Sequence, residues 1–213
     1  MPIEIEPKAR LAQIAQATMR VAEKRGADGV TIRAVAEEMG GSTTLVTNYI
    51  PSRTQLIKNA VLHALEGWEE DLARETDGVA PADELRALAL WSISTRGDDT
   101  TMRNLFIELL ARAKPDTGLD ALREDSEEHR ARFHAAAQAA GVPDPDFAAD
   151  ILYLVTRGFY FATVEQAEDW TTERVRPLML QLLEVLSTTA ATQHTSAASP
   201  GRVPKRRRAA PRG

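Results

Sequence analysis

The sequence lacks several features that would assign it to particular classes of protein. None of its 213 residues is a cysteine, which excludes disulfide bonds and Cys-ligated zinc and suits a reducing compartment. It has no run of about 18 consecutive apolar residues. Its acidic start, MPIEIEPKAR, has no apolar core. We therefore expect a cytoplasmic protein with no signal peptide and no contact with a membrane.

The sequence also lacks the residue spacings of metal and catalytic sites. The four histidines are scattered, and none follows a glutamate at the three-residue spacing of di-iron helical bundles. His129 and His134 are five residues apart, whereas a two-histidine helical site needs a spacing of four. No Gly-rich phosphate loop and no Ser/His/Asp spacing is present. We expect no metal, no cofactor and no enzymatic activity, with a small helical enzyme as one alternative.

The patterning that is present indicates an all-α protein. No alternating run of β-branched residues exceeds four, so the sequence does not predict strands. Apolar residues instead recur at helical spacing between Gly- and Pro-containing breaks. We expect a three-helix head over residues 1–51, a helical-bundle body over residues 52–192, and a disordered basic tail over residues 193–213. The expected helices include residues 8–26, 31–39, 43–50, 52–74, 83–95, 119–140, 146–169 and 171–190.

Charge is distributed unevenly along the chain, whose formal net charge is −5. Residues 1–60 contain 8 Lys and Arg against 6 Asp and Glu, whereas residues 61–192 contain 12 against 25. Residues 193–213 contain 6 basic and no acidic residues. DNA would attract both ends and repel the middle. Solvated helix faces in an acidic protein are the plainer explanation of the same pattern.

The segment VTIRAVAEEMGGSTTLVTNYIPSRTQLIK, residues 30–58, predicts two short helices joined by a tight turn. Thr31 and Ser42 are placed to cap the two helices, and Gly40-Gly41 ends the first of them. In the second helix, Thr44, Thr47 and Asn48 point outward together and can hydrogen-bond to base edges or phosphates. Helix–turn–helix pairs are common, however, and many never contact nucleic acid.

Together with the helix before it, this segment resembles the DNA-binding domain of the TetR family of bacterial transcriptional regulators. The matching residues are Arg10, Ile14, Ala17, Arg25-Gly26, Gly29, Thr31, Arg33, Val35-Ala36, Gly40, Ser42, Tyr49, Pro51-Ser52-Arg53, Leu56 and Val61. The sequence departs from the family at Gly41, where the family usually has Val, and at Leu45, Thr47 and Ile50 of the recognition helix. Tyr49 and Arg53 stand where the family usually contacts phosphates. Leu45 either meets a thymine methyl or is buried.

The resemblance implies a DNA-binding surface, an effector pocket and a dimer interface. For DNA binding we expect Thr31, Arg33, Ser42, Thr43, Thr44, Leu45, Thr47, Asn48, Tyr49, Arg53 and Lys58. For the effector pocket we expect Trp68, Trp91, Met102, Phe106, Phe133, Tyr153, Thr156 and Tyr160. Pockets are mostly apolar with a few placed polar groups, but each of these residues also suits a plain core.

The expected helix over residues 146–169 is apolar on nearly all sides and must therefore be covered on most of them. The resemblance implies that it and the last helix form a four-helix bundle with a second subunit. The expected interface residues are Ile151, Val155, Gly158, Phe159, Ala162, Leu178, Leu182 and Val185. A central helix in a monomer is the alternative.

The sequence thus favours a homodimeric regulator that binds a near-palindromic operator and is released by a small-molecule effector. Two alternatives belong to other classes. One is a helical module that coats DNA without reading its sequence, and the other is the small helical enzyme.

Overall fold

The computed structural model describes residues 6–94, 99–112 and 118–188, and the basic tail predicted for residues 193–213 lies outside them. Within these ranges all regular structure is helical, as the sequence predicts. The elements are α1 (Pro7–Arg25), the short 3-10 helix η1 (Ala27–Gly29), α2 (Ile32–Glu38), α3 (Thr43–Thr47), α4 (Arg53–Thr76), α5 (Pro81–Ser92), α6 (Asp99–Ala111), α7 (Asp120–Ala139), α8 (Pro145–Glu165) and α9 (Thr172–Thr188).

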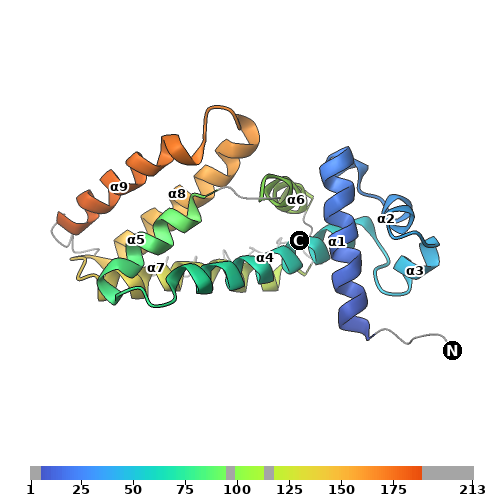
Figure 1. The fold of residues 1–213 in the computed structure, drawn as a ribbon, viewed down its shortest axis with the longest axis horizontal. Helices are drawn as coiled ribbons and strands as arrows, with labels where there is room; N and C mark the ends of the chain where they lie inside the picture. Colours follow the sequence, from blue (N-terminus) through green and yellow to red (C-terminus); the bar gives the residue numbers. More distant parts are fainter. Residues whose placement is uncertain (1–5, 95–98, 113–117, 189–213) are drawn as a thin grey trace, which may run out of the picture.

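The helices form a head and a body that share α4 (Figure 1). The head consists of α1, α2 and α3, which pack together around the start of α4 at one end of the molecule. From there α4 runs into the body, which contains α5, α7, α8 and α9. The helix α6 lies between the two parts and contacts α1, α4 and α8.

Local sequence signals explain where several helices begin and end. Gly26 follows α1 with a φ of +72°, a conformation that glycine adopts without a steric penalty. The Thr31 hydroxyl accepts a hydrogen bond from the Ala34 N–H at 3.0 Å, and the Ser52 hydroxyl accepts one from the Gln55 N–H at 3.3 Å. The predicted cap at Thr31 is confirmed, and Ser52 caps α4 in the same way. Ser42 makes no such bond, and α3 ends at Thr47 rather than at Ile50.

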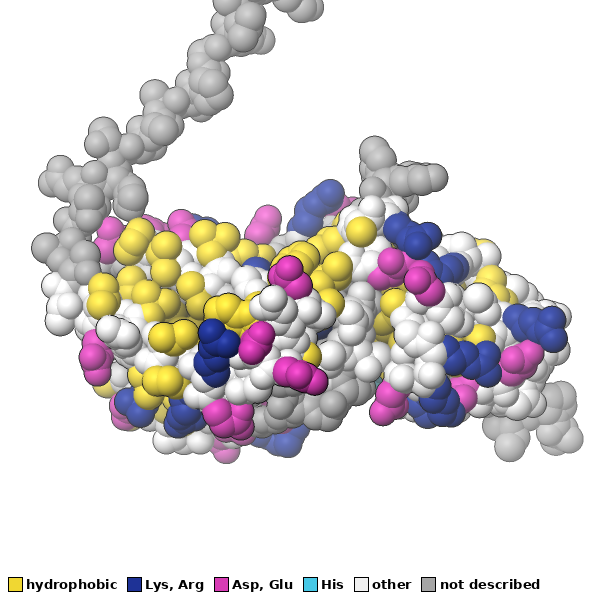
Figure 2. Space-filling model, turned by 90° about the horizontal axis from the view of Figure 1, so that it is seen from above, with side chains coloured by type: hydrophobic (Ala, Val, Ile, Leu, Met, Phe, Trp, Pro, Cys, Tyr) yellow, Lys and Arg dark blue, Asp and Glu magenta, His cyan; other side chains and the backbone are white. Residues whose placement is uncertain are grey.

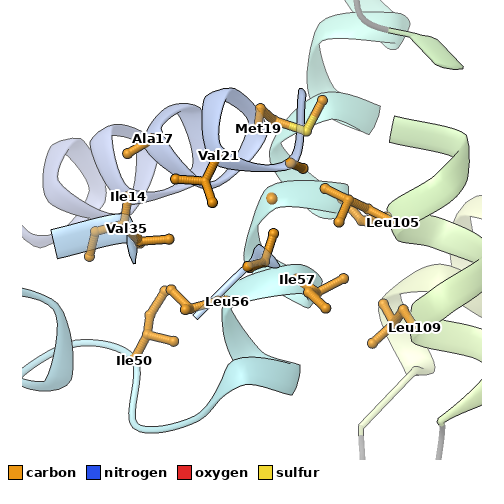
Figure 3. Packing of buried hydrophobic residues seen from close by; sticks show 14 of the residues in the cluster. Ile14, Ala17, Met19, Val21, Val35, Ile50, Leu56, Ile57, Leu105 and Leu109 are labelled. Atoms are coloured by element: carbon orange, nitrogen blue, oxygen red, sulfur yellow. The ribbon is translucent and has the colours of Figure 1, made fainter. Parts of the chain in front are cut away.

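Two apolar cores lie along α4, and the first joins the head to the body (Figure 3). It contains Ile14, Val35 and Leu56 of the head side together with Leu105 and Leu109 of α6. The second core fills the body between α5, α7, α8 and α9. The apolar core of the head therefore does not stop at residue 51, because α6 of the body completes it.

By length and composition, α8 is apolar enough to cross a membrane, although it contains no uninterrupted run of about 18 apolar residues. The most apolar 18-residue window of Pro145–Glu165 has a mean hydropathy of 1.2, and 39% of it is buried. Two features fit a packed helix of a bundle instead. One side of α8 packs along α7, and Arg157 in the middle of α8 pairs with Asp125 of α7.

Candidate functional site

The turn between α2 and α3 fixes the angle at which α3 leaves the head. Gly40 has a φ of +67°, its N–H donates to the Glu37 carbonyl, and the Gly41 N–H donates to the Ala36 carbonyl. These two bonds form a Schellman motif, which ends α2 sharply. Val46 is buried and anchors α3 against the rest of the head. The turn and this anchor hold α3 in one orientation.

The opposite side of α3 and its flanking residues form an exposed polar surface. It consists of Ser42, Thr43, Thr44, Thr47, Asn48 and Tyr49, and the Tyr49 side chain is 38% exposed. Hydroxyl and amide groups can donate to or accept from base edges and phosphates. None of these six residues is acidic, so none would repel a phosphate. The prediction that Thr44, Thr47 and Asn48 point outward together is confirmed, because all three are exposed.

Leu45 is half-buried, and the structure links it to the unusual glycine of the turn. A Cβ atom added to Gly41 would lie 2.6 Å from the Leu45 Cδ2 atom. Leu45 therefore occupies the space that a larger residue at position 41 would fill. Leu45 is thus partly buried, and its contact with a thymine methyl stays a prediction.

The second helix adds a charged group beside this surface. The Arg33 side chain is 85% exposed and pairs with Glu37 at 2.9 Å, one turn further along α2. Thr31 is exposed at the start of α2, although its hydroxyl already accepts the capping hydrogen bond. An exposed ion pair contributes little to stability, so Arg33 can exchange Glu37 for another anion at low cost.

The structure places Arg53 and Lys58 differently from the expectation that they contact DNA. The Arg53 guanidinium donates to the carbonyls of Val30 and Ala27 at 2.9 and 2.8 Å, and to the Glu108 carboxylate at 2.8 Å. The Lys58 ammonium donates to the Gly118 carbonyl. Both side chains hold parts of the protein together, because each finds acceptors inside the chain. In this structure these donors are engaged within the chain, and a phosphate contact by either residue stays a prediction.

In the body, three of the residues predicted for a pocket form an aromatic cluster. The Trp68 ring meets the edge of Trp91 at a centroid distance of 6.4 Å and Tyr160 at 5.6 Å. The Trp68 indole N–H donates to Asp99 at 2.9 Å, and the Trp91 indole N–H donates to Asp71 at 3.0 Å. The two cavities between these rings hold only about 20 and 30 Å³, whereas a cavity of about 510 Å³ lies on the side of Trp68 that faces α1 and is also lined by Asp71 and Asp99.

The other predicted pocket residues are distributed over several places. Phe106 and Tyr153 line a groove of about 310 Å³ between α6, α7 and α8. Met102 belongs to the core shared with the head, and Phe133 is fully buried in the core of the body. The Thr156 hydroxyl is buried without a hydrogen-bond partner. The structure therefore does not bring the eight residues together around one cavity.

The buried Arg103 and the half-buried Arg157 in this region were not predicted from the sequence. The Arg103 guanidinium donates to the Ser94 carbonyl at 2.7 Å and lies 4.6 Å from the Tyr160 ring centroid. The Arg157 guanidinium lies 5.0 Å from the Tyr153 ring centroid and 5.8 Å from that of Tyr160. Tyr153 lies four residues before Arg157 and Tyr160 lies three after it, so helical spacing contained a signal for this stacking.

Burial also changes the titration of groups close to these arginines. Desolvation, with Arg157 and Arg132 nearby, lowers the pKa of His129 to about 4, so His129 is neutral near pH 7. Its ring stacks on Phe133 and its Nε2 atom lies 3.2 Å from the Ser92 hydroxyl. Desolvation likewise raises the pKa of Asp125, although Arg157 opposes this shift. Among the described residues, no group of three or more His, Asp or Glu side chains is arranged to hold a metal ion.

The expected dimer residues fall mainly on one exposed apolar face of α8 and α9. Val155 and Gly158 of α8 are exposed, Leu178 and Val185 of α9 are 51% and 52% exposed, and Ile151, Ala162 and Leu182 are half-buried. Leu154 and Phe161, which were not predicted, extend the face and are 62% and 50% exposed. Figure 2 shows hydrophobic side chains gathered on the body, at the left of the view.

Phe159 does not belong to this face. It is only 4% exposed and packs beneath the Arg103 guanidinium, at 5.1 Å, inside the body. Its assignment to the dimer interface is corrected here. The reason is geometric, because Phe159 lies one residue after Gly158 and is therefore rotated by roughly 100° around the helix.

Comparison with known proteins gives matches to solved structures alone, since no protein-family model and no curated protein matches the sequence. A transcriptional regulator from Rhodococcus sp. Rha1 aligns with 85% of this chain and 96% of its own, at a TM-score of 0.72 and 17% identity. A putative TetR-family regulator from Rhodococcus sp. aligns with 85% of this chain and 100% of its own, at a TM-score of 0.67 and 22% identity. A putative regulator from Saccharomonospora viridis was solved in complex with choline. It aligns with 84% of this chain and 97% of its own, at a TM-score of 0.71 and 18% identity. The chain therefore has the fold of TetR-family transcriptional regulators.

Proposed function

We propose that the protein is a cytoplasmic, sequence-specific DNA-binding regulator of the TetR type, a repressor that a small molecule releases from its operator. One observation carries this proposal: the exposed surface of Ser42, Thr43, Thr44, Thr47, Asn48 and Tyr49 on a firmly anchored α3. A recognition helix needs exposed hydrogen-bonding groups and a fixed orientation. The structural neighbours are described as regulators and not as enzymes, which disfavours the helical-enzyme alternative.

We divide the residues of this surface and its surroundings into those that contact bases and those that contact phosphates. Asn48 can form two hydrogen bonds to an adenine, and Thr44 and Thr47 flank its place on the helix. Thr31, Arg33 and Tyr49 surround them and supply phosphate contacts, which position the head without reading sequence. Arg53 and Lys58 are omitted from the proposed contacts because both are bound within the chain.

The exposed apolar face of α8 and α9 supports a homodimer. A monomeric protein rarely exposes a continuous apolar face of this kind. Gly158 lies near the middle of the face, and a Cβ atom added there would meet nothing within 4 Å in this chain. Packing within one chain does not explain a glycine inside a helix, which costs about 1 kcal/mol relative to alanine. Gly67 of α4 has equally open surroundings, so it is the position of Gly158 within the exposed apolar face that supports close approach of a second helix there.

The structural neighbours support a ligand response. The Saccharomonospora viridis regulator was solved with choline, and the multidrug-binding protein EbrR, at a TM-score of 0.59 and 23% identity, was solved with imidazole. These two complexes support a small-molecule response in this chain. The groove between α6, α7 and α8, with a volume of about 310 Å³, is the site that we propose for it.

The proposal is tested by selecting DNA that the full-length protein binds from a pool of random sequences. We expect enrichment of a near-palindrome whose half-sites lie about one helical turn, roughly 10 bp, or whole multiples of it, apart. The control is Thr47→Glu, which adds a negative charge to the exposed surface without touching the core, and should abolish enrichment. If the wild type retains DNA without enriching any sequence, the DNA-coating alternative replaces the proposal.

A further inference from the structure

The groove between α6, α7 and α8 has a distinct chemical character. Its walls are apolar and consist of Phe106, Leu110, Leu119, Leu122 and Phe161. Its polar lining consists of Arg123, Ser126, Tyr153 and Arg157. Its volume of about 310 Å³ lies at the lower end of the range for small-molecule sites, which is roughly 300–1,000 Å³.

The charge of the groove is opposite to that of the region around it. Residues 61–192 contain 25 Asp and Glu against 12 Lys and Arg, yet both charged residues of the groove lining are arginines. No acidic side chain belongs to its described lining. A mainly apolar groove with two cations, in an otherwise acidic body, is complementary to a molecule with an anionic group and a hydrocarbon part.

Arg157 is placed to bind such an anionic group. Its side chain is 17% exposed, and its guanidinium lies 5.2 Å from the Phe106 ring centroid and 5.0 Å from that of Tyr153. It donates to the Ser126 hydroxyl at 2.9 Å, whereas the Asp125 carboxylate is 3.8 Å away. The guanidinium is thus held between aromatic rings, with an ion pair to Asp125 that is longer than a direct hydrogen bond. A ligand carboxylate can bind it in a bidentate manner.

We propose that this groove binds an amphipathic carboxylate, with the carboxylate on Arg157 and its hydrocarbon chain along Phe106, Leu110 and Leu122. The proposal rests on the proposed function, since this site would be the effector site of the regulator. Tyr153 supplies a hydroxyl donor at the polar end, whereas the Ser126 hydroxyl already donates to the Leu122 carbonyl at 2.8 Å and serves to hold Arg157. Arg123 lies at the exposed side of the groove, where its side chain is 70% exposed and pairs with Asp120 at 2.7 Å, so the charge available to a ligand is mainly that of Arg157.

The position of the groove connects it to the head. Phe106 and Leu110 of α6 face the groove, whereas Glu108 of the same helix holds Arg53 and, through it, the carbonyls of Ala27 and Val30 in the head. A ligand that displaces α6 would therefore disturb the contact that orients the head. Binding of the carboxylate and binding of operator DNA should oppose each other, by the same factor in both directions.

The test uses decanoate as the probe and isothermal titration calorimetry on the full-length protein, at concentrations below micelle formation. Decanol and decyltrimethylammonium carry a chain of the same length with no charge and with a positive charge. We expect decanoate to bind at least about tenfold more tightly than either, because a hydrogen bond to a charged partner is the stronger kind. Equal affinity for all three probes would overturn the proposal.

Variants distinguish a role of Arg157 in binding from a role in folding. Arg157→Gln should weaken decanoate binding by about tenfold or more, and Arg157→Lys, which keeps the charge, by less. Arg130→Gln removes an exposed arginine of α7 outside the groove and is the matched control, which should bind decanoate as the wild type does. A melting temperature is measured for each variant. If Arg157→Lys and Arg157→Gln both fold and bind decanoate like the wild type, the assignment of Arg157 is wrong.

Operator binding is measured separately, without any probe. A protein that selects an operator but does not bind decanoate overturns this inference and leaves the proposed function intact. A protein that binds decanoate but selects no DNA sequence overturns the proposed function and leaves a carboxylate-binding protein.

Discussion

The contact between Arg53 and Glu108 predicts that a single change in the body weakens the attachment of the head. Glu108 accepts from Arg53 at 2.8 Å and lies 2.6 Å from the Arg112 guanidinium. Glu108→Gln keeps the shape of the side chain but removes its charge. The Arg53 and Glu108 side chains are 27% and 18% exposed, so the pair is neither fully buried nor freely solvated.

The expected loss follows from this partial burial. Hydrogen bonds to charged groups contribute roughly 1.5–3 kcal/mol, and exposed ion pairs about 0–1 kcal/mol. We therefore expect Glu108→Gln to lower the free energy of unfolding by about 1–2 kcal/mol. In a chain of this size that corresponds to a melting temperature lower by about 2–8 °C.

Thermal unfolding followed by circular dichroism measures this change. The control is Glu127→Gln on the exposed side of α7, which should leave the melting temperature unchanged. The reasoning is refuted if Glu108→Gln and Arg53→Ala both melt like the wild type while Arg53→Ala weakens binding to all DNA sequences equally. Arg53 would then contact phosphates, as its position in the family pattern first implied.

Two further predictions concern assembly and pH. Gly158→Leu should convert the proposed dimer to a monomer or an aggregate in light scattering. Gly67→Leu, the same change at a second mid-helix glycine with open space around it, should leave the proposed dimer intact. A dimeric Gly158→Leu protein would remove α8 from the interface. Because the folded protein lowers the pKa of His129 from 6.5 to about 4, the unfolded chain takes up the proton first as the pH falls. The stabilising effect of neutral His129 is thus complete above about pH 6.5 and is lost progressively toward pH 4, by roughly 3 kcal/mol at most. His129→Gln should flatten this part of a plot of unfolding free energy against pH, and an unchanged slope would contradict the assignment.

The features that sequence reasoning predicted depend on residues close together in the chain. The Thr31 cap, the end of α1 at Gly26 and the outward set on α3 all follow from spacings within one or two helical turns. Such signals are local, and tertiary packing reinforced them here.

The features that sequence reasoning missed depend on contacts between segments that are far apart in the chain. Arg53 meets Ala27 and Val30 of the head and Glu108 of α6, and no spacing in the sequence shows that these groups converge. Burial of Arg103, which is 2% exposed, is likewise unusual for arginine, which is mostly exposed. Phe159 was misplaced for a different reason. Because α8 is apolar on nearly all sides, its sequence does not show which stripe faces the core.

The central claim, that α3 reads DNA sequence, is tested most directly by the affinity of Asn48→Ala for the selected operator and for a shuffled sequence. Tyr49→Phe, which removes a hydroxyl proposed to contact a phosphate, is measured alongside it. We expect Asn48→Ala to lose about 1–3 kcal/mol on the operator and almost nothing on the shuffled DNA. Tyr49→Phe should weaken binding to both DNAs alike. If Asn48→Ala weakens binding to the operator and to the shuffled DNA equally, then α3 does not read the sequence, and the account is contradicted.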